Sequence, residues 1–168
     1  MGADLSFIPE LEHAIANGSS ERRSQILQRV TDLFVLGSAR FSEDDIALFD
    51  DVIGRLVAKI EQSAQVMLAT RLAPIANSPP KTIRTLAFND AIEVAGPVLS
   101  QSPRLDDETL VELVSQKGQG HVLAIAHLPT LSEAVTTLLV KRGDRDVVIG
   151  SVGNKGAQFS DLGFAMLV

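Results

Sequence analysis

Histidines are the side chains in this sequence that could most readily bind a metal or transfer a proton, and there are three of them. His121 and His127 are six residues apart, which on a helix places their side chains about 120° apart around the axis. Metal-binding pairs on helices prefer a spacing of four, as in H-E-x-x-H, and the sequence lacks that pattern. We therefore interpret both residues as capping or solvent-exposed and predict no metal site.

A charged segment, Asp144-Arg145-Asp146, is the second candidate for a binding role. Its simplest interpretation is a solvated connection between two helices, and the alternative is the polar rim of a binding surface. If the protein has such a surface, we expect His121, Asp144 and Arg145 to contribute to it. The neighbouring segment from Gly150 to Gly156 is rich in glycine but lacks the Gly-Lys-[Ser/Thr] ending of a phosphate-binding loop.

No motif in the sequence assembles a catalytic group. There is no G-x-S-x-G pattern for a hydrolase nucleophile. There is also no Cys, which excludes thiol nucleophiles, thiolate metal sites and disulfides. The acidic cluster at 43–51 fits the first turns of a helix, where the helix dipole favours negative charge. We predict no catalytic, cofactor-binding or metal-binding residues, and we do not expect an enzyme.

The composition is that of a mildly acidic chain that can bury one core of domain size. Its 168 residues are 45% hydrophobic and carry a net charge of −6. Nucleic-acid binding needs clustered Lys and Arg, whereas the basic residues here are scattered, so we expect no nucleic-acid partner. Neither a signal-peptide pattern nor an apolar run long enough to span a bilayer is present, so we predict a cytoplasmic location and no membrane partner.

The elements that would position these residues repeat along the second half of the chain. Four signals, each with a helix breaker in third place, lie 24, 26 and 27 residues apart: Asn77-Ser78-Pro79, Gln101-Ser102-Pro103, His127-Leu128-Pro129 and Asn154-Lys155-Gly156. A residue suited to capping a helix lies in or after each signal, namely Ser78, Asp106, Ser132 and Ser160. A second apolar segment completes each unit, at 92–99, 122–126 and 147–152. For the last two segments a β-strand is the alternative, since they are short and β-branched.

Each unit is therefore a helix pair that can bury its apolar face only by stacking on similar pairs. We predict an all-α protein in which N-terminal helices precede a short right-handed α-solenoid of HEAT-like helix-pair repeats, each about 24–28 residues long. We expect residues 1–76 to form the N-terminal helical region and residues 77–168 to form the repeats, together making one compact unit.

The N-terminal region contains its own helix signals. A short helix is predicted over 5–16, and a second is predicted from a cap at Ser19 or Ser20 to a stop at Gly37. A capping box is predicted where Ser42 is followed three residues later by an Asp.

The strongest periodic pattern in the chain runs from residue 42 to residue 73, with apolar residues at spacings of three and four. It fits either one long helix or two helices broken near Gln62. One long helix would exceed the length of a repeat. Either a second copy of the chain covers the surplus, or the helix packs across two layers of its own chain.

The end of the chain is unusual for a helical repeat. Residues 162–168 form an apolar half-helix without a polar outer face, whereas terminal repeats normally have one. We expect the chain to be part of a longer protein, and the alternative is that a partner covers this segment.

Several stretches are similar to an alphaproteobacterial family of unknown function whose members have HEAT-like or leucine-rich-repeat-variant α-solenoid character. These stretches are Leu86-Ala87-Phe88-Asn89-Asp90, Ile92 to Leu99, Leu105 to Glu108, Ala124-Ile125-Ala126 and Arg142-Gly143-Asp144. The resemblance covers roughly residues 65–168 and implies a helical-repeat fold, but it implies no activity, cofactor or site residue. Pro97 departs from a regular repeat, so its helix must be short, kinked or begin there.

We expect this protein to be a non-catalytic protein-interaction or scaffold module, with a protein partner that includes a second copy of the chain as one candidate. The alternative is a small-ligand-binding regulatory domain, or an enzyme, with a pocket between the N-terminal helices and the repeats.

Overall fold

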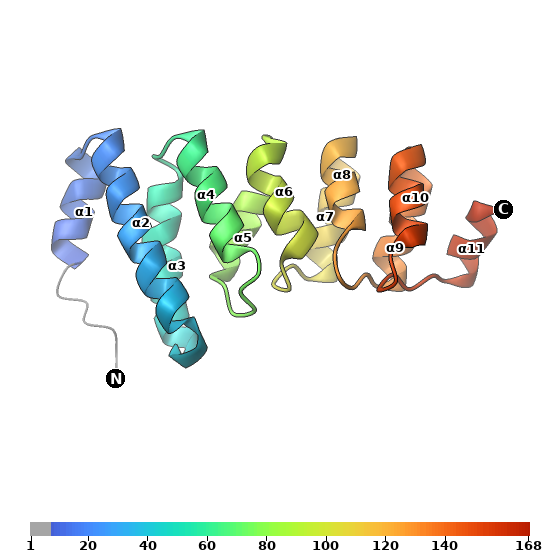
Figure 1. Ribbon diagram of the computed structural model, residues 1–168, viewed down its shortest axis with the longest axis horizontal. Coiled ribbons are helices and arrows are strands. Elements are labelled where there is room, and N and C mark those ends of the chain that lie inside the picture. The colour runs from blue at the N-terminus through green and yellow to red at the C-terminus, as the bar shows by residue number, and fades with distance from the viewer. Residues whose placement is uncertain (1–7) are drawn as a thin grey trace.

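The computed structural model describes residues 8–168, and all regular secondary structure in that range is helical (Figure 1). The α-helices are α1 (Ile8–Asn17), α2 (Ser20–Gly37), α3 (Glu43–Val57), α4 (Gln62–Leu72), α5 (Pro80–Ala87), α6 (Ile92–Gln101), α7 (Asp107–Gln116), α8 (Gln119–Ala126), α9 (Glu133–Arg142), α10 (Arg145–Gly153) and α11 (Asp161–Leu167), with a 3-10 turn at Ser38–Arg40. The predicted all-α fold class is confirmed. The segments 122–126 and 147–152 are helical and not strands.

The helices lie in two rows that follow the long axis of the molecule (Figure 1). In one row, which we call the even row, α2, α4, α6, α8 and α10 each pack on the next. In the odd row α3 packs on α5, α7 packs on α9, and α9 packs on α11. One continuous apolar core lies between the rows and extends from α1 to α10.

The connections lie alternately at the two edges of this arrangement. Those that lead from an even helix to the next odd helix lie along the bottom in Figure 1, and we call this side the lower edge. They comprise residues 38–42, 73–79, 102–106, 127–132 and 154–160. The upper edge holds the shorter connections that lead from an odd helix to the next even helix.

Most helices begin where a short polar side chain accepts a hydrogen bond from the backbone three residues later. The residues with this role are Ser19, Ser42, Asp106, Ser132, Asp144 and Ser160. At Ser42 the bonding is reciprocal with Asp45, as the predicted capping box requires. Such caps each contribute about 1 kcal/mol, and they fix the helix starts locally.

The start of α5 is an exception, and here the sequence prediction was wrong. Ser78 does not cap α5, because its hydroxyl is buried and donates to the carbonyl of Leu72 at 2.7 Å. The carboxylate of Asp50, which belongs to α3, takes this role. It accepts hydrogen bonds from the backbone of Lys81 at 2.9 Å and from the backbone and hydroxyl of Thr82 at 2.8 and 2.7 Å. A buried charge thus joins two neighbouring helices of the odd row.

The region from 42 to 73 forms two helices and not one. α3 ends at Val57 and α4 begins at Gln62, so the break precedes the predicted position near Gln62 by a few residues. The amide of Gln65 donates to the carbonyl of Val57 at 2.9 Å and closes the turn. The longest helix is instead α2, with 18 residues. The surplus length that suggested a second copy therefore does not exist.

Polar contacts between neighbouring layers join residues that are about one repeat apart in sequence. The side chain of Arg104 reaches the carbonyl of Ser78, 26 residues away, and Lys117 reaches Asp90, 27 residues away. Near the N-terminus the side chain of Asn77 reaches the carbonyl of Ser38 across 39 residues. α2, α3 and α4 thus continue the same two rows, but with 18, 15 and 11 residues they are longer and therefore lack the period of the later helices. The predicted helix at 5–16 corresponds to α1, and its first three residues lie outside the described range.

Candidate functional site

His121 is a buried structural residue in α8. Its side chain is only 7% exposed, and its Nε2 lies 2.8 Å from the carbonyl oxygen of Asn89. The ring thereby holds the connection between α5 and α6 against α8. This differs from the expected capping or solvent-exposed role, because the residue faces the preceding layer of the stack. His127 does match that expectation, since it is exposed and its Nδ1 lies 2.8 Å from the carbonyl of Leu123 at the end of α8.

Asp144 and Arg145 lie at the upper edge, at the start of α10. The carboxylate of Asp144 accepts a hydrogen bond from the backbone N–H of Val147 at 3.1 Å. The backbone N–H of Asp144 donates to the side-chain oxygen of Gln119 at 2.8 Å. Arg145 is exposed in the first turn. Within the part of the chain that the structure describes, no hydrogen bond or ion pair joins His121 to either residue. The three predicted site residues are therefore placed near one edge but do not converge.

Several carboxylates along the stack are held in their charged form. The ammonium of Lys117 holds the pKa of Asp90 below its usual range, and the guanidinium of Arg84 does the same for the pKa of Glu112. Hydrogen bonds from the side chain and backbone of Thr109 lower the pKa of Asp106. These groups join or cap helices, which explains their shifts without any catalytic role.

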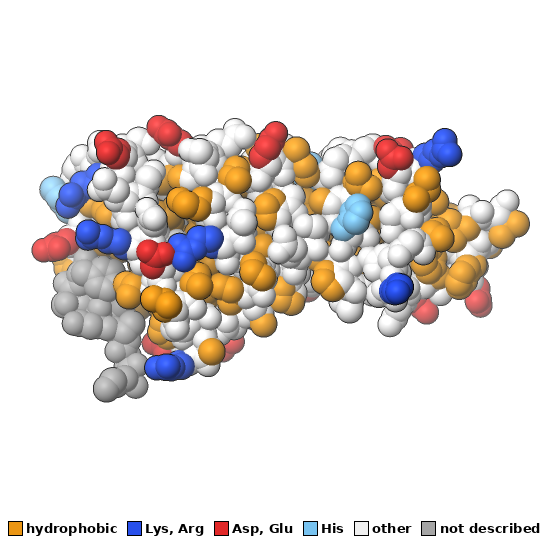
Figure 2. All heavy atoms as spheres, viewed as in Figure 1, with side chains coloured by type: hydrophobic (Ala, Val, Ile, Leu, Met, Phe, Trp, Pro, Cys, Tyr) orange, Lys and Arg blue, Asp and Glu red, His pale blue; other side chains and the backbone are white. Residues whose placement is uncertain are grey.

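The surface shows no concentration of positive charge on the face drawn in Figure 2, where basic, acidic and apolar side chains are interspersed. Among residues 8–168, no three or more His, Asp or Glu side chains are grouped so that they could hold a metal ion. Over the same range, none of the helices combines the length and the apolar character needed to cross a bilayer.

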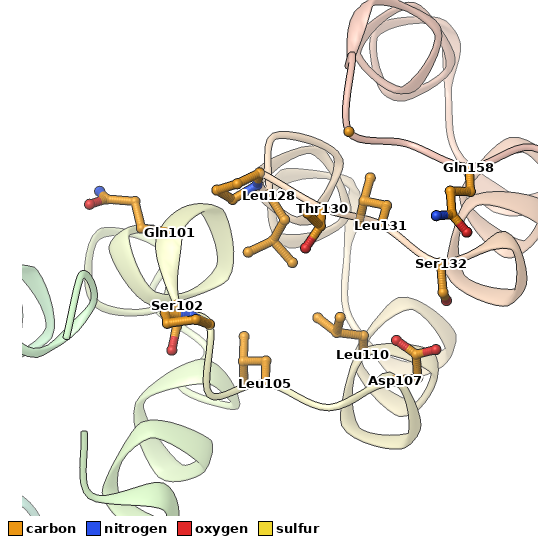
Figure 3. Close-up of a pocket in the computed structure, with 13 residues that line it drawn as sticks. Gln101, Ser102, Leu105, Asp107, Leu110, Leu128, Thr130, Leu131, Ser132 and Gln158 are labelled. Carbon is orange, nitrogen blue, oxygen red and sulfur yellow. The ribbon is translucent and has the colours of Figure 1, made fainter. Parts of the chain in front are cut away.

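A hollow of about 400 Å³ opens at the lower edge between three successive connections (Figure 3). We call it the lower-edge hollow. Leucines from separate layers line its apolar part: Leu105, Leu110, Leu128 and Leu131. Polar side chains, including Asp107 and Thr130, lie around them. The hollow thus combines an apolar floor with a polar rim, which is the usual composition of a ligand pocket.

Side-chain hydrogen bonds fix the connections that form this hollow. The guanidinium of Arg104 donates to the carbonyl of Ser78 at 2.8 Å, which ties the connection 102–106 to the one before it. The amide of Asn154 donates to the carbonyls of Ala126 and Leu128 at 2.8 and 2.7 Å, and its Oδ1 accepts from the backbone of Gly156 at 2.9 Å. The backbone around the hollow is therefore held in place before any ligand arrives.

The last two connections also pair through their backbones. Leu131 donates to the carbonyl of Gly156 and accepts from the N–H of Gln158, both at 3.0 Å, which makes an isolated parallel bridge. A Cβ atom at Gly156 would lie 1.7 Å from the carbonyl oxygen of Pro129, so no larger residue fits without separating the two connections. The sequence pattern alone predicts only a helix breaker at Gly156.

Sequence reasoning missed the lower-edge hollow, although one signal for it was present. The breaker signals ending at Pro103, Pro129 and Gly156 recur with the repeat period. In a stack of helix pairs, segments that recur with this period lie side by side on one edge. Each signal alone predicts a boundary between helices, whereas together they also mark a surface.

The fold and this site define the chain as a helical-stack protein with a preformed, partly apolar hollow between its connections. A family model described as "Uncharacterised protein conserved in bacteria (DUF2336)" matches residues 94–168. The expected similarity to a family of unknown function is confirmed in this form, as a bacterial family, over a shorter range than residues 65–168. No curated protein and no solved structure matches the chain.

Proposed function

We propose that this protein is a HEAT-like α-solenoid that acts in the cytoplasm as a non-catalytic protein-interaction or scaffold module. Its binding site is the lower-edge hollow, and its ligand is an extended segment of a partner protein. The observation that carries this proposal is the convergence of three consecutive connections, held by Arg104 and Asn154, around an apolar floor.

The chemistry of the hollow suits a peptide segment with an apolar anchor side chain. Its volume of about 400 Å³ lies in the range of roughly 300–1,000 Å³ that is common for ligand pockets. The leucines of its floor offer apolar contact, while hydroxyl and carboxylate groups at the rim, such as Thr130 and Asp107, can bind peptide N–H groups.

The lower edge also provides an internal example of the proposed binding mode. The segment Gly156 to Gln158 already lies alongside Leu131 and makes two backbone hydrogen bonds with it. An extended chain can therefore pair with these connections without disturbing the helices. Because the backbone of these connections is already fixed, the protein itself loses little conformational entropy when a ligand binds.

The proposal is tested by selecting peptides from a random library against the purified protein and measuring their affinity by titration calorimetry. The substitution Thr130→Arg places a bulky charge at the exposed rim, and we expect it to weaken binding at least about tenfold, which corresponds to about 1.4 kcal/mol. Thr85→Arg is the matched control, because Thr85 is exposed on α5 and lies away from the hollow. We expect it to leave the affinity unchanged.

Two results would contradict the proposal. In the first, the selected peptides bind Thr130→Arg as tightly as the unaltered protein, so that the lower-edge hollow is not their site. In the second, no peptide binds, while a thermal-shift screen finds a nucleotide or metabolite that raises the melting temperature. That result would favour the small-ligand or enzyme alternative.

A further inference from the structure

Among the described residues that line the lower-edge hollow, Asp107 is the only one that carries a charge. It is the first residue of α7 and is exposed, and within residues 8–168 no hydrogen bond or ion pair occupies its carboxylate. A hydrogen bond between a carboxylate and a cationic donor is roughly twice as strong as one between neutral groups. The free carboxylate of Asp107 is therefore suited to bind a cationic group of a ligand.

The surroundings of Asp107 add to the negative charge. Asp106 and Glu108 flank it in sequence, and Glu133 lies in the first turn of α9, next to the rim residue Ser132. The N-termini of α7 and α9 contribute the opposite sign, about half an elementary charge each. Four carboxylates outweigh these two helix ends, so this side of the rim attracts cations.

The basic residues of the neighbouring segments do not neutralise the rim. Arg104 donates to the carbonyl of the preceding connection and approaches Glu43 to 3.6 Å, so its charge faces the preceding layer. Arg84, on α5, pairs with Glu112 at 2.7 Å. Lys155 is exposed in the connection 154–160. None of these three basic residues lines the hollow, so a cationic ligand meets no like charge on its wall.

Asp107 also lies beside the apolar floor of the hollow. Leu110 follows it by three residues on α7, so the two side chains share one face of the helix, with about 5–6 Å between their Cβ atoms. In Figure 3 both side chains lie on the α7 side of the hollow. A ligand that places an apolar group on Leu110 therefore needs its cation at a similar distance to reach Asp107.

An extended segment provides this spacing through alternate residues. Its side chains two positions apart point to the same side and are separated by about 6–7 Å along the strand. This separation is close to the one between Leu110 and Asp107, and the flexible stem of a Lys or Arg can cover the difference while it packs on apolar surface. An apolar residue can thus contact the leucine floor while a basic residue two positions away binds Asp107.

We propose that the lower-edge hollow selects partner segments in which a Lys or Arg lies two residues from an apolar anchor, and that Asp107 binds the cation. This inference rests on the proposed function, because it assigns a class of ligand to the same hollow. The partner is accordingly a protein with a basic, partly apolar segment in extended conformation. Acidic segments are disfavoured, because their charge would have to approach Asp107 and the carboxylates around it.

The test uses peptides selected from a random library against the purified protein. We expect a Lys or Arg two positions from an apolar residue to be enriched in them over the unselected library. Titration calorimetry then compares the unaltered protein with Asp107→Asn, each with the tightest peptide and with a version whose basic residue is replaced by Gln. Either change alone should weaken binding about threefold to tenfold, and both together should weaken it no more than one alone.

Asp44→Asn is the matched control, because Asp44 is an exposed acid in the first turn of α3 and does not line the hollow. We expect it to leave the affinity unchanged. Salt screens ion pairs, so a higher ionic strength should weaken peptide binding to the unaltered protein more than to Asp107→Asn. Circular dichroism checks that both variants stay folded.

The outcomes separate this inference from the proposed function. If no peptide binds, or if Thr130→Arg leaves the affinity unchanged, the hollow is not the site and both proposals are overturned. If Thr130→Arg weakens binding but the selected peptides are neutral or acidic, the hollow binds peptides without the preference for a cation. If basic peptides bind Asp107→Asn as tightly as the unaltered protein, Asp107 does not bind the cation. The last two results overturn only the inference about charge.

Discussion

At the scale of single residues, a few side chains join layers that are distant in sequence. Asp50 is the best example, since its buried carboxylate accepts three hydrogen bonds from the start of α5. Asn154 and Gly156 have a comparable role at the other end of the stack, where they hold two connections together. These residues are the positions at which single substitutions test the fold most sharply.

We expect Asp50→Ala to lower the free energy of unfolding by about 2–4 kcal/mol, because the backbone N–H of Lys81 and two buried donors on Thr82 lose their acceptor. Asp51→Ala is the matched control. Asp51 is exposed and forms an ion pair with Arg55 one turn away, so its loss should cost at most about 0.5 kcal/mol. Urea unfolding followed by circular dichroism measures both values, and equal losses in the two variants would refute the role given to Asp50.

We expect Gly156→Ala to lower the free energy of unfolding by about 1–3 kcal/mol, because the added methyl group collides with the carbonyl oxygen of Pro129. Gly153→Ala provides the comparison, since a Cβ there meets nothing within 4 Å and Gly153 lies in the last turn of α10. That variant should be neutral or more stable by up to about 1 kcal/mol. A neutral Gly156→Ala would mean that the two connections are not closely paired.

At the scale of helices, most are short and depend on their caps and on the neighbouring layers. α5 to α11 are 7 to 10 residues long, and isolated helices of that length are marginal in water. The caps at Asp106, Ser132 and Ser160 fix where these helices begin, but packing on the next layer supplies most of their stability.

The contacts between helices should make stability depend on pH in the acidic range. The pKa values of Asp90 and Glu112 lie below their ordinary range in the folded chain, mainly because of Lys117 and Arg84 in the neighbouring layer. Between the lowered and the ordinary pKa, the unfolded chain binds more protons than the folded chain. Stability from these pairs is therefore fully present above about pH 5 and falls as the pH drops below about 4.

Urea unfolding at a series of pH values from neutral to acidic measures this dependence. We expect the loss of stability on acidification to be smaller in Lys117→Met, because Asp90 then lacks the partner that lowers its pKa. The same acid-induced loss in both proteins would contradict the assigned cause.

Sequence alone predicted the features of these helices that are local. The caps at Ser19, Ser42, Asp106, Ser132 and Ser160 follow from side chains next to the helices they start, and all are confirmed. The break between α3 and α4 remained open because residues 58–61 contain neither Pro nor Gly. The roles of Asp50, His121 and Asn154 depend on partners 26 to 32 residues away, and no local pattern reveals such partners.

At the scale of the whole molecule, two rows of helices share one core and gather every second connection along one edge. The breaker signals in the sequence, 24 to 27 residues apart, fall in or at the edge of the lower-edge connections of the second half. The spacing of these signals did not reveal that the longer helices α2, α3 and α4 continue the same two rows. Longer helices place their connections farther apart in the sequence, so a search for a repeat of 24 to 27 residues does not find them. The lower-edge hollow arises at this scale, since no single helix pair contains it.

The most direct test of the proposed binding edge is an NMR titration of the isotope-labelled protein with a selected peptide. We predict that amide shifts concentrate in the connections 102–106, 127–132 and 154–160, which form the lower-edge hollow. Shifts concentrated instead around His121, Asp144 and Arg145 would contradict this proposal. They would place the binding site at the upper edge, on the three residues that the sequence predicts as a candidate binding surface.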